Sequence, residues 1–192
     1  MKRFNIALSM VSVLLLVIPS AAQAQGEKVR ASLKASVTQR LGIDTDITID
    51  YSRPGVKGRV IWGKLVPYGL APGNNYSKDK PFPWRAGANE NTTIQCTKDI
   101  LVEGKKLPAG KYGIHMIPSE KNWIIAFSKK NDLDGSYLYN QEDDIFRITV
   151  TPISSPHQEW LLYGFDDLSG TSATAFLHWE KLKVPFKIQI IQ

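Results

Sequence analysis

Two short segments of the chain carry side chains that could form a binding site. The first, residues 53–59, concentrates three cations around Pro54 and Gly55. The second, residues 84–90, brings an indole, a guanidinium, an amide and a carboxylate together within seven positions. The candidate ligand-binding residues are Arg53, Lys57, Arg59, Trp84, Arg85, Asn89 and Glu90.

These residue types suit a polar or anionic small ligand, and a sugar is among the candidates. Arginine offers a rigid fork of donors to a carboxylate or phosphate, and an indole offers a flat face to a ring. We therefore expect a non-catalytic binding site between the turn at residues 53–59 and the loop at residues 68–90. The structural alternative is that Arg85 pairs with Glu90 or another acid, and that Trp84 belongs to the core.

Two further functions stay open at this point. In the second hypothesis the chain is a hydrolase or isomerase of the cell envelope that uses Glu90 as general acid or base, which requires Glu90 to be buried beside a histidine or another acid. In the third, an exposed sheet edge or a loop docks another envelope protein. The sequence identifies no catalytic residue, so whether the chain is an enzyme stays undecided, with the balance against it.

Other catalytic and metal-binding patterns are missing from the sequence. There is no Gly-x-Ser-x-Gly motif, and His115, His157 and His178 are far apart, so we expect surface or hydrogen-bonded imidazoles. Cys96, the only cysteine, falls on the apolar side of a predicted strand and is expected to be a buried, inert thiol. No His-x-His, Glu-x-x-His or cysteine pair is present, so neither a metal nor a cofactor is predicted.

The acidic stretches at residues 131–135 and 142–144 have the oxygen ligands that calcium prefers. They lack the spacing and the closing glutamate of an EF-hand loop. Solvated turns are therefore expected there.

The N-terminus has the pattern of a secretory signal. Lys2 and Arg3 precede an apolar run that reaches Ile18, and Ala22-Gln23-Ala24 suits a signal peptidase. We expect cleavage after Ala24 and a periplasmic or secreted protein without a membrane span, because the run is short for an anchor. The predicted mature chain, residues 25–192, has 168 residues (192 − 24), which suits a single domain.

The charge of the chain is mildly basic. The formal net charge is +6, and it becomes +4 without Lys2 and Arg3. Because the cations are scattered and interleaved with acids, and because export would remove the usual partner, nucleic acid is not an expected partner. A small polar ligand is the expected partner, and the oligomeric state stays open.

Alternating apolar and polar residues recur along the chain and predict strands. Such segments are residues 29–37, 47–51, 92–97, 112–116, 146–150, 173–179 and 184–190. Continuous apolar runs at residues 123–127 and 160–165 predict strands that are buried on both faces. No segment has a convincing helical period.

Glycine- and proline-rich turns separate these segments, as expected for antiparallel sheets. Nine or ten strands exceed what one open sheet packs comfortably. We therefore predict a mostly β fold, an antiparallel two-sheet sandwich with a jelly-roll-like arrangement, as one domain. Residues 66–91 form the longest stretch without periodicity, and their aromatic content indicates an ordered loop that packs on the body and serves a function.

Four segments resemble an exported bacterial family known as domain of unknown function 2911. They are Tyr51-Ser52-Arg53-Pro54-Gly55-Val56-Lys57-Gly58-Arg59, Trp84-Arg85-Ala86-Gly87-Ala88-Asn89-Glu90-Asn91-Thr92-Thr93, Gly104-Lys105-Lys106-Leu107-Pro108-Ala109-Gly110-Lys111-Tyr112 and Trp179-Glu180. The resemblance extends from about residue 31 to residue 190 and implies a β-rich exported domain without established catalytic residues. This chain departs from the family pattern by residues 70–83, an insertion that could alter access to a site.

Overall fold

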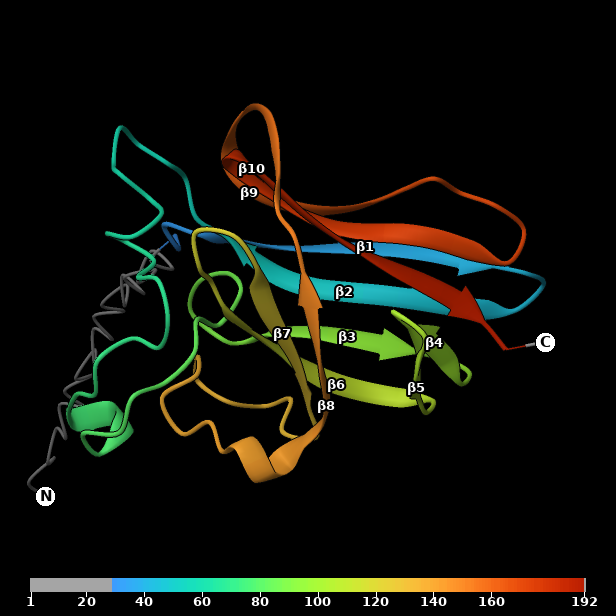
Figure 1. Cartoon of the computed structure of the whole chain (residues 1–192), viewed down its shortest axis with the longest axis horizontal. Coiled ribbons are helices and arrows are strands. Elements are labelled where there is room, and N and C mark those ends of the chain that lie inside the picture. The colour runs from blue at the N-terminus through green and yellow to red at the C-terminus, as the bar shows by residue number, and fades with distance from the viewer. Residues whose placement is uncertain (1–28, 192) are drawn as a thin grey trace, which may run out of the picture.

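The fold consists of two antiparallel β-sheets, as the sequence predicts. The structure is a computed structural model that describes residues 29–191. The predicted signal sequence therefore lies outside the described residues. Among the described residues there is no α-helix, only the 3₁₀ turns η1 (Asn75–Ser77) and η2 (Gln141–Asp143) (Figure 1).

The larger sheet has six strands in the order β1-β2-β3-β6-β7-β8. These are β1 (Leu33–Leu41), β2 (Thr45–Arg53), β3 (Thr92–Cys96), β6 (Gly110–Ile117), β7 (Trp123–Ser128) and β8 (Asp144–Val150). The smaller sheet, in the order β5-β4-β10-β9, contains β4 (Ile100–Val102), β5 (Lys105–Leu107), β9 (Ile153–Asp166) and β10 (Ser172–Ile190). The sheets are not closed into a barrel.

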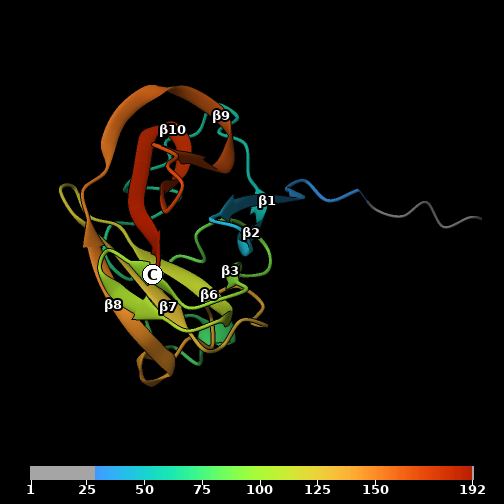
Figure 2. The same cartoon turned by 90° about the vertical axis from the view of Figure 1, so that its right-hand side faces the viewer.

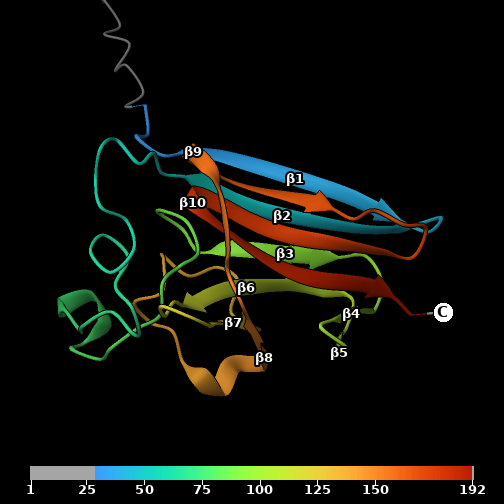
Figure 3. The same ribbon diagram turned by 45° about the horizontal axis from the view of Figure 1, so that its top comes forward.

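The two sheets form two layers, and the core lies between them. Figure 2 shows β9 and β10 lying across the curved larger sheet, and Figure 3 shows the long strands of both layers running along the molecule. Alternate residues of each strand point inward, so Ile47 and Ile49 of β2 and Ile114 and Met116 of β6 are fully buried. The opposite face of the larger sheet carries polar side chains.

The first strand begins later than the alternation predicts. β1 starts at Leu33, and Val29 is 82% exposed. The reason is that β1 is paired only with β2, whose strand ends at Arg53 opposite Leu33, so the residues before Leu33 have no ladder partner. The expectation of a half-buried strand over the whole of residues 29–37 is therefore wrong at its N-terminal end.

The C-terminal strands also differ from the prediction. Residues 173–179 and 184–190 belong to the single strand β10, which continues through register shifts on either side of Glu180. Residues 160–165 were expected to be buried on both faces, but β9 buries only one face. Leu161 and Tyr163 are buried, whereas Trp160 is 40% exposed. β4 and β5, a short hairpin around Gly104, carry too few residues for a periodic signal, and the sequence interpretation missed them.

Candidate functional site

The turn after β2 is attached to β9 by its backbone. Gly55 bridges to Trp160, and Val56 N donates to Glu159 O at 2.8 Å. Lys57 N donates to the carboxylate of Glu159 at 2.8 Å. Because these bonds fix the backbone, the cations that follow are displayed at one place on the surface.

Arg59 is held by the same turn. Its guanidinium donates to the carbonyl of Val56 at 3.1 Å and to that of Gly55 at 2.5 Å. Two of the five N–H donors of an arginine are thus occupied by neutral acceptors. Arg59 has no ion pair with any residue that the structure describes, so its charge is free to meet a ligand.

The segment that follows residue 83 is anchored on the larger sheet. Trp84 exchanges two backbone hydrogen bonds of 2.8 Å with Met116 of β6. The carbonyl of Ala86 accepts from the hydroxyls of Thr92 and Tyr163, both at 2.9 Å. Since Tyr163 comes from β9, residue 86 is tied to both sheets, which fixes the neighbouring Arg85.

Four tryptophans form a cluster at this end of the sandwich: Trp62, Trp84, Trp123 and Trp179. The rings of Trp84 and Trp179 are stacked, with centroids 6.1 Å apart, and Trp62 meets each of the other three edge to face. Trp123 and Trp179 are buried, whereas Trp84 is partly exposed. Trp84 therefore packs against the core, as the structural alternative predicts, while part of its surface stays accessible.

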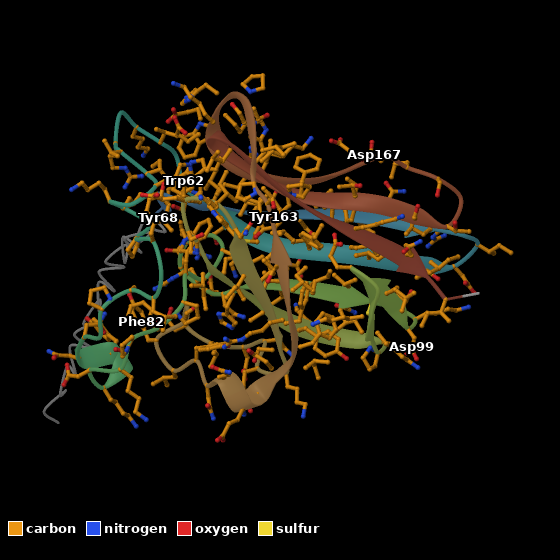
Figure 4. All side chains as sticks on the ribbon, viewed as in Figure 1. Trp62, Tyr68, Phe82, Asp99, Tyr163 and Asp167 are labelled. Atoms are coloured by element: carbon orange, nitrogen blue, oxygen red, sulfur yellow. The ribbon has the colours of Figure 1, made fainter. Side chains whose placement is uncertain are left out.

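A pocket of about 450 Å³ lies between the turn and the loop. We call it the cationic pocket. Its apolar wall includes Phe82, Pro83, Trp84, Trp179, Leu65 and Val66, and its charged residues are Lys57, Arg59 and Arg85. No acidic residue lines it among the described residues. In Figure 4, Trp62, Tyr68 and Phe82 mark this end of the molecule, and Asp99 and Asp167 mark the other.

Arg85 has partners that the sequence did not indicate. Its guanidinium donates to the carbonyl of Asn89 at 2.6 Å and lies 4.6 Å from the ring centroid of Tyr137. The structural alternative, in which Arg85 pairs with Glu90 or another acid, is wrong: Arg85 has no ion pair among the described residues, and Glu90 pairs with Arg30 and Lys34. Gly135 is necessary here: its φ is +74°, and a side chain there would overlap the guanidinium.

Three predicted residues do not line the cationic pocket. Arg53 donates to the carbonyl of Leu161 at 2.9 Å, and Asn89 donates to that of Ser32 at 3.3 Å. Glu90 pairs with Arg30 at 2.5 Å and with Lys34 at 3.3 Å. These three residues are close to the pocket residues in the sequence, but their side chains bind to other parts of the protein.

Glu90 is poorly suited to act as a general acid or base. The hydrogen bond from Arg30 lowers the pKa of the Glu90 carboxyl from 4.5 to about 2, with Lys34 acting in the same direction. Its ionic partners among the described residues are cations, whereas the enzyme hypothesis requires a histidine or an acid. A carboxylate of such low pKa is a weak base near neutral pH.

The histidines and Cys96 have different surroundings. His157 pairs with Glu159 on the surface, but His115 is fully buried, and its Nδ1 lies 2.6 Å from Ser136 Oγ. Burial and the charge of Arg85 lower the pKa of His115 to about 4. Cys96 is buried, as predicted, and burial raises its pKa. Residues 29–191 contain no group of three or more potential metal ligands.

Residues 70–83 form part of the pocket rather than a detached loop. Ala71 and Phe82 pair through two backbone hydrogen bonds, and both line the pocket. Phe82 and Tyr76 pack on Tyr137, with ring centroids 5.1 and 5.3 Å apart. Trp179, which lines the pocket, and Tyr137, which contacts Arg85 and Phe82, were not among the candidate residues. Trp179 was noted only as part of the family resemblance, because no local signal connects it to a loop that precedes it by dozens of positions.

Comparison with known proteins gives a family but no relative of known activity. No curated protein and no solved structure matches the chain. None of the described residues forms a helix that is both long and apolar enough to cross a membrane. A family model described as a protein of unknown function (DUF2911) matches residues 32–188, which cover nearly all of the described structure, and the chain belongs to this family.

Proposed function

We propose that this protein is an exported, non-catalytic binding protein for a small anion with an apolar, preferably flat, body. The charged, apolar and small residues of the N-terminus support export. One observation carries the ligand class: the cationic pocket joins Lys57, Arg59 and Arg85 to a tryptophan-containing wall and has no acidic residue in its lining.

The size and the chemistry of the pocket agree with this ligand class. Sites for small molecules enclose several hundred Å³, are mostly apolar, and contain a few polar groups that set orientation. Arg59 and Arg85 are held by neutral carbonyls, so they keep both their position and their charge. A carboxylate or phosphate would accept hydrogen bonds from their remaining N–H donors, and the apolar body of the ligand would pack on Trp84.

Calorimetric titration with matched ligands tests the proposal. Phenyl phosphate and benzoate are the anionic probes, and benzyl alcohol is the neutral probe of similar size. We expect the anions to bind and the alcohol to bind at least about tenfold more weakly, because a hydrogen bond to a charged group contributes roughly 1.5–3 kcal/mol.

Matched variants locate the site. Arg59→Gln removes a charge from the lining and is expected to weaken the anions about tenfold. Lys64→Gln removes a charge from a nearby exposed position outside the lining, and is expected to have little effect. Equal binding of the neutral probe, or equal loss in both variants, would contradict the proposal. No binding by any anion would favour the interaction-protein hypothesis.

A further inference from the structure

The outer face of the larger sheet carries a second pocket, which is distinct from the cationic pocket. Its volume is about 540 Å³. We call it the sheet-face pocket. Its lining includes Lys34, Asp50, Glu90, Asn91, Thr93 and Lys111, together with residues 131–133. Strands β1, β2, β3 and β6 thus form its floor, and the loop after β7 forms one wall.

Two residues of the pocket lining carry buried polar atoms without a partner. Across residues 29–191, five buried side-chain polar atoms have no hydrogen-bond partner. Two of them, Asn91 Oδ1 and Thr93 Oγ1, belong to the lining of this pocket, and a third, His115 Nε2, belongs to a neighbour outside the lining. Each of these three residues is at most 6% exposed. Leaving a buried polar group unpaired is unfavourable, so two such groups in one lining point to a ligand.

Gly113 brings these three atoms together. It is the cross-strand partner of Thr93, and Asn91 and His115 are each two residues away along the same faces of β3 and β6. The point where a Cβ of Gly113 would stand is 2.7 Å from Asn91 Nδ2 and 3.2 Å from His115 Nε2. A Cβ there would also overlap the carbonyl of Lys130, so only glycine fits between these closely packed groups.

The charges around the opening are mixed and largely paired. Lys111 lies 3.2 Å from Asp50, and Lys34 lies 3.3 Å from Glu90. Asp132 has no ion pair among the residues that the structure describes. Because each lysine already faces a carboxylate, a simple anion gains little here, and the one remaining carboxylate, that of Asp132, is exposed and offers a simple cation little.

We propose that the sheet-face pocket binds a neutral polyhydroxylated compound, such as a sugar unit or a cyclitol. Each hydroxyl group both donates and accepts, so it can serve the amide oxygen of Asn91 and the hydroxyl of Thr93, which both line the pocket. The two ion pairs at the opening offer further donors and acceptors to the same kind of ligand. The volume suits one or two sugar rings.

An NMR titration with simple polyols tests this site on the purified protein. The probes are glucose, N-acetylglucosamine and myo-inositol, each up to about 100 mM, where even a dissociation constant of tens of millimolar gives measurable occupancy. We expect at least one probe to shift the side-chain amide signals of Asn91 and the methyl signals of Thr93. Glycine and acetate serve as charged probes and are expected to leave these signals unchanged.

Isosteric variants separate the site from general surface effects. Thr93→Val keeps the shape and removes one unpartnered hydroxyl, and we expect it to weaken the polyol at least threefold, which is about 0.65 kcal/mol. Thr149→Val makes the same change at an exposed position of β8, outside the pocket lining, and is expected to leave binding unchanged.

Arg59→Gln, which tests the cationic pocket, is also expected to leave polyol binding unchanged, so the two proposals fail independently. No shift at Asn91 or Thr93 with any of the three polyols would overturn the proposal. Unchanged binding by Thr93→Val, or a response to the charged probes only, would overturn it as well.

Discussion

The two pockets share a border but are built from different parts of the fold. Arg85, Gly87 and Ala88 line the cationic pocket, whereas Glu90 and Asn91 line the sheet-face pocket. The cationic pocket rests on the tryptophan cluster, so its wall is continuous with the core. The sheet-face pocket rests on the polar outer face of the larger sheet. Packing against the core restricts which side chains can form the wall of the cationic pocket. The polar outer face has no such restriction, so it can carry unpaired polar groups.

The largest expected effect comes from the wall of the cationic pocket. Trp179→Ala removes a buried indole that stacks on Trp84, and we expect a loss of about 3–5 kcal/mol in the free energy of unfolding. Denaturant titration measures it. A loss below about 1 kcal/mol would show that the cluster is not part of the core and would remove the difference between the two pockets.

The second effect concerns the buried histidine behind the sheet-face pocket. His115 has a pKa of about 4 when folded and 6.5 in its ordinary state, so between these pH values the unfolded chain binds more protons. Stability should therefore fall as the pH drops from 6.5 to 4, by on the order of 3 kcal/mol from this group.

The pH dependence of denaturant unfolding checks this prediction. His115→Gln is expected to flatten the curve between pH 6.5 and pH 4. If this variant keeps the wild-type slope, the pKa of His115 is the same in the folded and unfolded chains, and its surroundings are wetter than its burial indicates.

The third effect lies on the shared border. Arg85→Ala removes the hydrogen bond to Asn89 and the contact with Tyr137, and we expect a loss of about 1–2 kcal/mol in unfolding free energy. The same variant should weaken anions in the cationic pocket but not polyols in the sheet-face pocket. Thermal unfolding measures the loss of stability, and the two titrations measure the binding of each ligand. Equal weakening of both ligands would show that Arg85 affects both pockets.

The smallest effect is expected at the floor of the sheet-face pocket. Thr93→Val replaces a buried hydroxyl that lacks a partner, so stability should change by less than about 1 kcal/mol, in the stabilising direction. Thr92→Val is the contrasting neighbour, because its hydroxyl donates to Ala86, and it is expected to destabilise by about 1 kcal/mol. Denaturant titration compares the two, and a larger loss for Thr93→Val would mean that its hydroxyl has a structural role.

The sequence of this protein predicts most of its strands, because the alternation of apolar and polar residues indicates which face of a strand is buried. Residues 47–51, 112–116 and 146–150 lie in the strands that the alternation predicts. The two-sheet antiparallel fold and the burial of Cys96 follow from the same patterns. The short hairpin of β4 and β5 escapes because three residues carry no period.

Local sequence also indicated two loops with candidate ligand-binding residues, since clusters of cations, an indole and glycine turns are visible without a structure. Only the tertiary structure decided which side chains meet. It placed Lys57, Arg59, Trp84 and Arg85 around one pocket, turned Glu90 toward Arg30, and set His115 beside Asn91 and Thr93. Such contacts depend on strand register and on loops that cross between sheets, and these long-range pairings have no local signature in the sequence.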